Sequence, residues 1–462
     1  MSWQEEIYKV PVLLEEKGVN YEYEYEYVLR GLHKHEVRQW SEFCASVFSY
    51  KTNPPQADYF YRHYANDPTT SPRGSSRYIR VATFEGRIVA SCRIFRKEIS
   101  KGDPRTNNPD SNPTTLRSGG IGEVCTDVHH RRRGLSKKLL ETAIDIMEHE
   151  NARIAGDFQI SSLHAAPTFF PLYESLGYSA PPLSNPSGGN RWSTVDFHWK
   201  QRNSKEPESN NQQTTGRTTT NTDLFRMIRT AEFPRDTQVL KPLHARYSED
   251  RLVGCIVRSQ EYWNNYLSQE LEGSLHVMES NAGQIVSWLS LKRDSSIGNV
   301  FSVREFGIDA SFLENNQQQH EQEQEEESLS MDHIVGALVA HAIEAIVGVD
   351  GRSASAIRSS LKLPGFVSDE IRSCETIRDT KDKDKNLPYF DWESECTEID
   401  RGWMYRSVGK RKKGNRCVGN EKREKETAAT NEFLGFVQGI TTTPSEKPFT
   451  RREHFVWPSD SF

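Results

Sequence analysis

The first clear pattern along the chain is an alternation of aromatic and acidic residues. In YEYEYEYVLR, residues 21–30, every second side chain is aromatic or aliphatic, which is the period of a strand with one buried face. Residues 35–48 change to helical spacing, and Asn53-Pro54-Pro55 ends that pattern before a second aromatic helix near 59–64. The pattern therefore predicts one strand followed by two helices.

Two further strands, at 78–84 and 87–95, are predicted on either side of the tight turn Glu85-Gly86. Beyond a loop rich in Asn, Pro, Ser and Gly, strands alternate with helical spacing. The expected elements are a strand at 121–128, an amphipathic helix at 135–147, a strand at 160–165, a short helix from Pro167 and a closing strand at 192–199. We assign residues 1–200 to this first unit.

Residues 201–222 contain no large apolar residue, which predicts a disordered linker. A second unit, 223–408, then repeats the order of the first. Its expected elements are a strand at 224–229, helices at 237–247 and 262–267, a hairpin of 274–278 and 284–291, a strand at 303–308 and a helix at 334–347. The sequence thus predicts an α+β chain of two similar units, each a mixed, mostly antiparallel sheet flanked by helices.

Polar insertions interrupt the second unit and follow it. Residues 314–330 and 367–398 are acidic, and 409–429 contains the basic run Lys410–Lys413; all three are expected to be disordered surface loops. The final segment, 430–462, ends in the aromatic tail HFVWPSDSF. We expect this tail to dock on the protein, because exposed Phe and Trp side chains are unfavourable in water.

Composition narrows the class of protein. Mean hydropathy is -0.74 and the formal net charge is -6, so the polar insertions dilute the aromatic cores and a general nucleic-acid binder is not expected. No apolar run reaches transmembrane length and no signal peptide is evident, so no membrane association is expected. The 7 cysteines are widely spaced without a CxxC, which favours reduced thiols in a cytoplasmic protein with no metal site.

The segment GEVCTDVHHRRRGLSKKLLETAI, residues 122–144, carries the most chemical information. A strand ends near Val128, a short turn holds three arginines and Gly134, and a helix follows at once. The first-turn amides of that helix have no internal partners, and its macrodipole is positive there. With the arginine charges, this arrangement predicts a cradle for a pyrophosphate, although it matches neither a P-loop nor a Rossmann turn.

The cradle resembles the Q/R-x-x-G-x-G/A signature of the GCN5-related N-acetyltransferase (GNAT) superfamily, which grips acetyl-CoA. Arg131 stands at the Q/R position and Gly134 at the first glycine, while Ser136 departs from the final Gly/Ala. The resemblance implies that the preceding strand splays from its neighbour, accepts the pantetheine arm and offers a backbone amide to the acetyl oxygen. The implied cofactor-binding residues are Val124, Cys125, Thr126, Arg131, Arg132, Arg133, Gly134, Leu135 and Ser136.

A second signature, FFPLYESLGY at 169–178, looks like the F-Y-x-x-x-G-F/Y element of the same superfamily. The resemblance implies that Tyr173 is catalytic and protonates the leaving CoA thiolate, a role that suits a phenol. Buried core packing of the tyrosine is the alternative. Cys125, close in sequence to His129 and His130, also leaves a covalent acetyl-thioester open, but strand alternation gives no reason for a histidine to reach it.

Two groups within the superfamily are more closely similar. VASCRIFRKEI (89–99) and SSLHAAPTFFPLYESLGY (161–178) resemble fungal lysine N-acetyltransferases, and HHRRRGLSKKLL resembles the Eis acetyltransferases; both groups append a second unit of the same kind. Eis enzymes use their terminal carboxylate as base, which implies the same role for Phe462. The other candidate bases are Glu123, Asp127 and His164.

Between 308 and 334 the second unit has the acidic, Gln-rich insert where the first has its cradle. Acidic residues repel a pyrophosphate, so we expect one catalytic site per chain and a degenerate second unit that shapes the substrate pocket.

The leading hypothesis is an acetyl-CoA-dependent N-acetyltransferase that uses no metal and acts in a ternary complex. Its acceptor is a primary amine, either a small molecule such as lysine or a protein lysine. The alternative is a non-catalytic acyl-CoA sensor or scaffold. The basic run Lys410–Lys413 leaves a nuclear location open, and the Eis resemblance leaves a homo-oligomer open.

Overall fold

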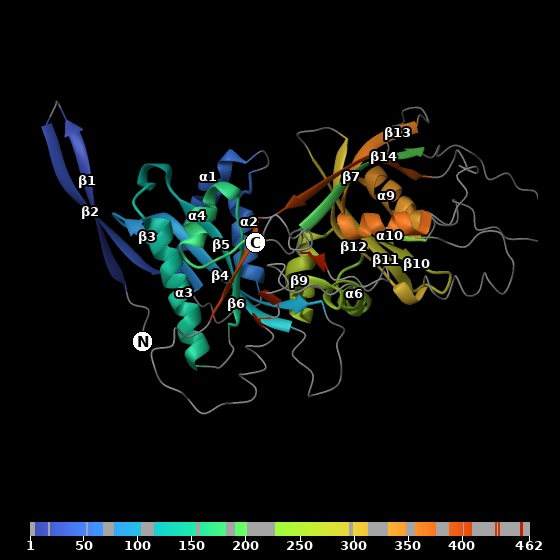
Figure 1. The fold of residues 1–462 in the computed structure, drawn as a ribbon, viewed down its shortest axis with the longest axis horizontal. Helices are drawn as coiled ribbons and strands as arrows, with labels where there is room; N and C mark the ends of the chain where they lie inside the picture. The colour runs from blue at the N-terminus through green and yellow to red at the C-terminus, as the bar shows by residue number, and fades with distance from the viewer. Residues whose placement is uncertain are drawn as a thin grey trace, which may run out of the picture.

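The computed structural model describes most of the two expected units. The described residues are 5–16, 19–51, 54–67, 78–102, 115–153, 158–181, 190–200, 227–294, 299–312, 331–347, 356–375, 388–400, 402–408, 430–431, 433–434 and 453–455. They form two sheets, each with helices packed on it (Figure 1). No helix among these residues is both long enough and apolar enough to cross a membrane.

The first sheet has nine strands, and its main path runs β1-β2-β3-β4-β5-β6-β15. Neighbours on this path are antiparallel except β5 and β6, which are parallel; β9 pairs with β4, and β16 with β9. The strands are β1 (Glu6–Glu16), β2 (Val19–Gly31), β3 (Ile79–Phe84), β4 (Arg87–Lys101), β5 (Thr115–Thr126), β6 (Ile160–His164), β9 (Leu252–Val257), β15 (Trp403–Ser407) and β16 (Glu453–His454).

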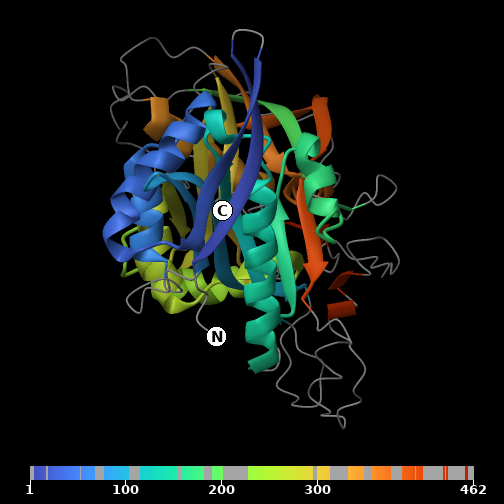
Figure 2. The same ribbon diagram turned by 90° about the vertical axis from the view of Figure 1, so that its left-hand side faces the viewer.

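Helices cover both faces of this sheet (Figure 2). Strand alternation divides the core, because Val81 packs with α1 and α2 while its neighbour Ala82 packs with α3. The helices are η1 (Lys34–Glu36), α1 (Val37–Val47), η2 (Phe48–Tyr50), α2 (Ala57–Asn66), η4 (Val128–His130), α3 (Leu135–Arg153), η5 (Pro167–Phe169) and α4 (Phe170–Glu174).

The second sheet has seven strands in the order β14-β7-β13-β12-β11-β10-β8. Its strands are β7 (Asn190–Lys200), β8 (Ile228–Thr230), β10 (Leu275–Glu279), β11 (Ile285–Arg293), β12 (Val300–Ile308), β13 (Ala356–Pro364) and β14 (Tyr389–Asp400). Its helices are α6 (Thr237–His244), η6 (Ala245–Glu249), η7 (Tyr262–Leu267), α7 (Ser268–Glu270), α9 (Met331–Val347) and α10 (Gly365–Glu375).

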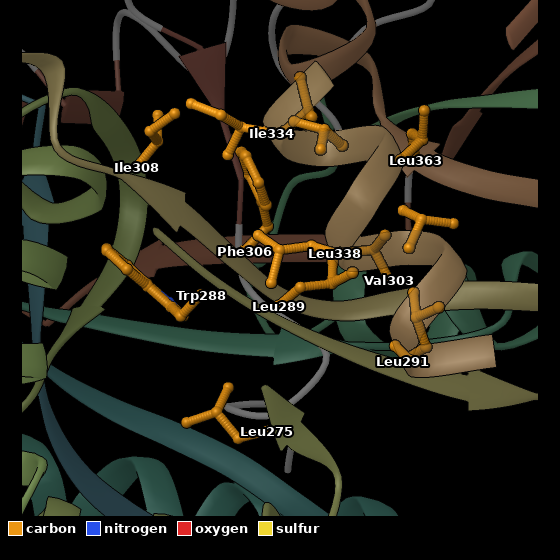
Figure 3. Close-up of a cluster of buried hydrophobic side chains, with 14 of the residues drawn as sticks. Leu275, Trp288, Leu289, Leu291, Val303, Phe306, Ile308, Ile334, Leu338 and Leu363 are labelled. Atoms are coloured by element: carbon orange, nitrogen blue, oxygen red, sulfur yellow. The ribbon is translucent and has the colours of Figure 1, made fainter. Parts of the chain in front are cut away.

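Large apolar side chains from the second sheet and α9 form one core (Figure 3). Trp288, Leu289 and Phe306 of the sheet are fully buried, as are Ile334 and Leu338 of α9. Because α9 is apolar around most of its circumference, it needs cover on several sides, which the sheet and α10 supply.

The two units repeat one topology, as the sequence predicts. In the first, β5 crosses through α3 to the parallel strand β6; in the second, β12 crosses through α9 to the parallel strand β13. Both parallel pairs are short. They join Ser118–Ile121 to Ile160–Leu163 in the first unit and Val300–Ser302 to Ser360–Lys362 in the second.

The units exchange their last strands, which corrects the predicted boundary at residue 200. The strand predicted at 192–199 to close the first unit is β7, and it pairs with β13 and β14 in the second sheet. The equivalent edge of β6 is filled by β15 from the end of the second unit. Alternation in the sequence fixes that β7 is a strand, but it carries no information about which sheet the strand joins.

Two more sequence predictions need comment. The disordered loop predicted over 367–398 is wrong at both ends, because Gly365–Glu375 is helix α10 and Tyr389–Asp400 is strand β14. The acidic residues dominate the composition of this region and conceal a few apolar positions. The side chains at those positions are buried: Phe366, Val367, Ile371 and Phe390. The linker 201–222, the basic run in 409–429 and residues 314–330 lie outside the described residues, as does Phe462.

The docking expected of the C-terminal tail is seen at Phe455. Its side chain is buried against Trp192 and Phe366, in the core of the second unit.

The strand exchange makes a stability prediction. Met404 of β15 is fully buried in the α3-side core of the first unit, opposite Leu163. Met404→Ala should lower the unfolding free energy by about 2–5 kcal/mol, measured by urea denaturation, because it leaves a cavity in that core. Val239→Ala, at a residue 43% exposed, should cost less than about 1 kcal/mol and serves as the control. A cost at Met404 no larger than at Val239 would contradict the placement of β15.

Candidate functional site

The site is built where β5 leaves β6. The parallel pairing of these strands ends at Ile121 with Leu163, although β5 continues to Thr126. Beyond Ile121, the strand pairing of β5 among the described residues is with β4 on its other side, through Cys125 with Ser91 and Thr126 with Ala90. The β6-facing edge of residues 122–126 therefore carries backbone groups that no strand pairs, as the resemblance implies for the pantetheine arm.

A bulge in β5 lies at the same point. The register passes from Arg93–Gly122 to Ser91–Cys125, so Glu123 and Val124 share a single facing residue on β4. Glu123 has a φ of 51°, a left-handed conformation that is uncommon for a residue with a side chain. The bulge turns the Glu123 side chain into the protein, where it is 6% exposed.

Glu123 is the most perturbed carboxyl of the site. Its Oε1 lies 3.2 Å from Nη1 of Arg93, and its Oε2 is buried with no hydrogen-bond partner among the described residues. Burial raises the pKa of Glu123 to about 7, and the Arg93 charge opposes that rise. A buried carboxyl that titrates near neutrality, with one oxygen unengaged, is suited to accept a proton.

Arg93 fixes this carboxyl in place. Its guanidinium is fully buried and also reaches Oδ2 of Asp67 at 3.1 Å, and it stacks on the ring of Phe95. Sequence analysis missed Arg93. The signal was there, because Arg93 is the one charged residue in the largely apolar run 88–95, and a buried arginine requires an acid.

The predicted cradle occupies the turn between β5 and α3. Arg132 and Gly134 both have positive φ, 62° and 77°, which makes the turn tight enough for the helix to begin at Leu135. The side chains of Arg131 and Arg132 are exposed, and Leu135 is buried beneath them. Arg131 donates from Nε to the Thr126 carbonyl oxygen at 3.3 Å.

Ser136, the departure from the superfamily pattern, has a structural partner. Its Oγ lies 2.7 Å from Oγ1 of Thr126, so a hydrogen bond ties the start of α3 to the end of β5. An alanine or glycine at this position would lack that bond. The two predicted cofactor-binding residues Thr126 and Ser136 are thus brought together directly.

The third arginine of the turn faces another way. Arg133 donates to Oη of Tyr27, lies 3.0 Å from Nδ1 of His130 and stacks over the ring of Tyr25 at 4.3 Å. Its guanidinium is therefore engaged with β2, and only Arg131 and Arg132 extend their charge into solvent. Sequence analysis did not distinguish among the three.

Tyr173 lies in α4, on the α3 side of the first sheet. It belongs to the same apolar cluster as Val124, and its ring meets that of Tyr178 at 6.1 Å. Burial raises the pKa of the Tyr173 phenol, so the hydroxyl holds its proton at neutral pH. Glu123, by contrast, reaches Arg93, which packs against α1 and α2 on the other face. Glu123 and Tyr173 thus approach β5 from opposite faces of the sheet.

The other candidate bases are engaged elsewhere. Asp127 caps η4 by accepting a hydrogen bond from the amide of His129 at 2.8 Å. His164 is 44% exposed and lies 2.9 Å from Oδ2 of Asp400, at the β15 edge of the sheet.

Cys125 points into the core and not toward the histidines of the turn. Its sulfur lies 4.0 Å from that of Cys44 in α1, and burial raises the Cys44 pKa. This arrangement gives Cys125 no base, which disfavours the thioester alternative.

A cavity of about 940 Å³ lies between the units, away from Glu123 and Tyr173. It opens beside Arg96 of β4 and Arg117 of β5, on the far side of Ile121 from the bulge, and reaches Lys241 and Tyr262. Neither Glu123 nor Tyr173 lines it, so we do not assign the reaction to it.

Comparison with family models finds a match within the first unit. Residues 28–180 match the family model described as an acetyltransferase (GNAT) domain. No curated protein matches the chain.

Several solved structures are similar to most of the chain at low identity. A probable N-acyltransferase of unknown function from Enterococcus faecalis V583 is 10% identical with a TM-score of 0.45, over 83% of this chain and 73% of its own. Eis1 from Mycobacterium abscessus is 12% identical with a TM-score of 0.40, over 82% and 73%. N-myristoyltransferase from Saccharomyces cerevisiae with bound myristoyl-CoA is 10% identical with a TM-score of 0.41, over 82% and 83%. At these identities and TM-scores the solved structures carry no argument about function, so the match of residues 28–180 to the family model is the more informative comparison.

The turn conformation leads to a prediction at Gly134. A Cβ there would lie 2.9 Å from Oη of Tyr8, and the positive φ disfavours any other residue. Gly134→Ala should therefore lower the unfolding free energy by about 1–2 kcal/mol or more. Gly86→Ala is the matched control, because Gly86 has a φ of 76° and no atom within 4 Å of its Cβ position. Equal costs at the two glycines, measured by denaturant titration, would contradict the close approach of Tyr8.

Proposed function

We propose that this chain, whose residues 28–180 match the model of a GNAT acetyltransferase domain, transfers an acetyl group from acetyl-CoA to a primary amine. The observation that carries the proposal is the buried carboxyl of Glu123, with its pKa near 7, on a strand whose next residues have lost their neighbour. A core carboxylate without function would be costly, because its desolvation is only partly offset by Arg93.

The residues around the splayed strand fit an acyl-CoA. The pantetheine arm would lie along the edge of Val124, Cys125 and Thr126 that no longer pairs with β6, where the Thr126 carbonyl oxygen already accepts a hydrogen bond from Arg131. The amides at the start of α3, from Leu135 and Ser136, would hold the pyrophosphate with the exposed side chains of Arg131 and Arg132. Gly134 allows the close approach, and Arg133 contributes through its backbone. Acetyl-CoA supplies an activated acetyl thioester when bound.

The chain's own groups then move two protons and hold one charge. Glu123 accepts a proton from the substrate ammonium, which frees the amine for direct attack in a ternary complex. The Val124 amide, in the bulge, donates to the acetyl oxygen where negative charge develops. The Tyr173 hydroxyl, kept protonated by burial, gives its proton to the departing sulfur as the carbon–sulfur bond breaks. The attacking nitrogen then gives up its second proton, which restores the Tyr173 hydroxyl through solvent and leaves a neutral amide and the free CoA thiol.

The acceptor amine is either a small molecule such as lysine or a protein lysine. The second unit packs against α2 beside the site, through His63 with Glu270 and Asn66 with Gln269. That contact favours an enclosed acceptor over an open protein groove. Phe462, through its terminal carboxylate, remains a proposed alternative base.

The proposal predicts a pH profile. If Glu123 is the base, kcat/KM should rise with pH through about 7 as its carboxyl loses the proton, and then level off. Glu123→Gln should lower kcat by about 10²–10⁴-fold and abolish that rise, since the amide cannot accept the proton. Release of free CoA thiol across pH 5.5–9 would measure both effects.

The control for Glu123 is deletion of Ser461–Phe462. If Glu123 is the base, the deletion should leave the rise near pH 7 in place. A deletion that removes turnover while Glu123→Gln retains it would assign the base to Phe462.

A second prediction concerns Tyr173. Tyr173→Phe keeps the ring in its apolar cluster but removes the acidic proton, so kcat should fall by about 10²-fold while the Kd for CoA stays nearly unchanged. Turnover of a panel of primary amines and calorimetric CoA binding provide the two readings. CoA binding by the wild type without turnover of any amine would favour an acyl-CoA sensor instead.

A further inference from the structure

The N-terminal hairpin β1–β2 extends well beyond the first sheet as a two-stranded ribbon (Figures 1 and 2). Its register pairs Tyr8 with Tyr27 and Val10 with Tyr25, which places Tyr8, Tyr25 and Tyr27 on one face near its base. We call these three residues the tyrosine clamp. Side chains of this face pack on the α3-side core of the first unit, with Phe84.

The clamp closes on the cradle turn at several points. Tyr8 Oη donates to the Arg133 carbonyl oxygen at 3.3 Å, and the same hydroxyl lies against Gly134. Tyr27 Oη accepts a hydrogen bond from Arg133 and lies 3.0 Å from Nδ1 of His130. The Tyr25 ring lies under the Arg133 guanidinium at 4.3 Å, within the range of a cation–π contact.

Phe84 forms an apolar wall behind these contacts. Its ring lies 5.1 Å from Tyr25, 5.5 Å from Tyr27 and 5.1 Å from His130. Polar bonds shielded by aromatic rings are stronger than the same bonds in water. The turn is thus held from the ribbon side by aromatic packing, by hydrogen bonds and by the cation–π contact between Arg133 and Tyr25.

This arrangement explains why one arginine of the turn faces away from the proposed ligand. Arg133 anchors the turn to the ribbon, so its backbone is fixed while the neighbouring Arg131 and Arg132 remain exposed. Arg132 and Gly134 both need left-handed backbone, a conformation that an untethered turn would readily leave. Fixing that backbone in advance lowers the entropy lost when an anion binds to its amides.

We propose that Tyr8, Tyr25 and Tyr27 are positioning residues, which hold the turn 129–134 in the conformation that binds the pyrophosphate of CoA. This proposal rests on the proposed function, since it assigns the ribbon a role in the same CoA site. The clamp touches the turn and not the proposed reacting groups Glu123 and Tyr173, so its loss should weaken CoA binding more than it slows the reaction at saturation.

His130 adds a pH dependence. Its Nδ1 must offer a lone pair to Tyr27 and Arg133; on protonation, a second cation would stand 3.0 Å from the Arg133 guanidinium. Burial, and then Arg133, lower the pKa of His130 below its usual range. The charged groups that influence it are Arg133, Asp127, His129 and Arg87, and the ring packs against Tyr27 and Phe84. The clamp should therefore be intact at neutral pH and weaken as the pH falls below the usual range of histidine and His130 gains a proton.

The test is calorimetric binding of dephospho-CoA, which keeps the pyrophosphate but lacks the 3′-phosphate that itself titrates near pH 6. At pH 7.5, Tyr27→Phe should raise the Kd about tenfold with the melting temperature nearly unchanged, and kcat at saturating acetyl-CoA should stay within about twofold. Tyr50→Phe, at a residue 73% exposed and outside the ribbon, is the control and should bind as the wild type does.

The pH arm uses His130→Asn, which keeps a hydrogen-bond acceptor near the Nδ1 position but cannot gain a proton. The wild-type Kd for dephospho-CoA should rise between pH 7 and 5, and that of His130→Asn should not. If Tyr27→Phe fails to fold, Tyr8→Phe takes its place in the calorimetric test, because it removes the hydrogen bond from the ribbon to the Arg133 carbonyl oxygen.

The outcomes separate the two proposals. If the wild type binds no CoA, the proposed function fails. If the wild type binds but folded Tyr27→Phe binds equally well, the clamp proposal is wrong while the proposed function stands. If the Kd for dephospho-CoA rises equally in the wild type and in His130→Asn as the pH falls, His130 is not the source of the pH dependence.

Discussion

The feature on which the site depends is the loss of pairing between β5 and β6 after Ile121. Two parallel strands that stayed paired would leave no free backbone between them, and α3 would begin against a closed sheet. The bulge at Glu123 and Val124 lies just beyond that point and turns a carboxylate into the core. Arg93 forms ion pairs with both this carboxylate and Asp67. One change in strand pairing therefore provides both the opening for a ligand and the proposed proton acceptor.

The exchange of β7 and β15 makes the two units one structure. Each sheet needs a strand beside its short parallel pair, and each receives it from the other unit. An unfilled edge at β6 would expose backbone and the apolar residues near Leu163 close to the proposed site. The need to pair exposed strand edges also explains β9, which pairs with the end of β4 that extends beyond β3.

Local patterns predicted much of this correctly. Alternation and helical spacing identified β2, β3, α3, β10, β11 and α9, and the repeated order of elements identified two α+β units. The Arg-rich turn before a helix was predicted from sequence, and the turn is there, with Gly134 at positive φ. The roles of its residues, and of Tyr173, stay predictions. Composition misled over 367–398, because acidic residues between sparse apolar positions conceal a helix and a strand that bury the apolar ones.

By itself the sequence determined the helices and strands, because short-range periodicity predicts them. It also determined the residue types at the cradle, because these form one contiguous motif. Only the tertiary structure decided which sheet β7 and β15 join, that Glu123 meets Arg93, and that Arg133 turns to Tyr25 and Tyr27. Each of these links residues far apart in the chain. Pairing and burial of that kind depend on which surfaces the whole fold brings together, which no local pattern encodes.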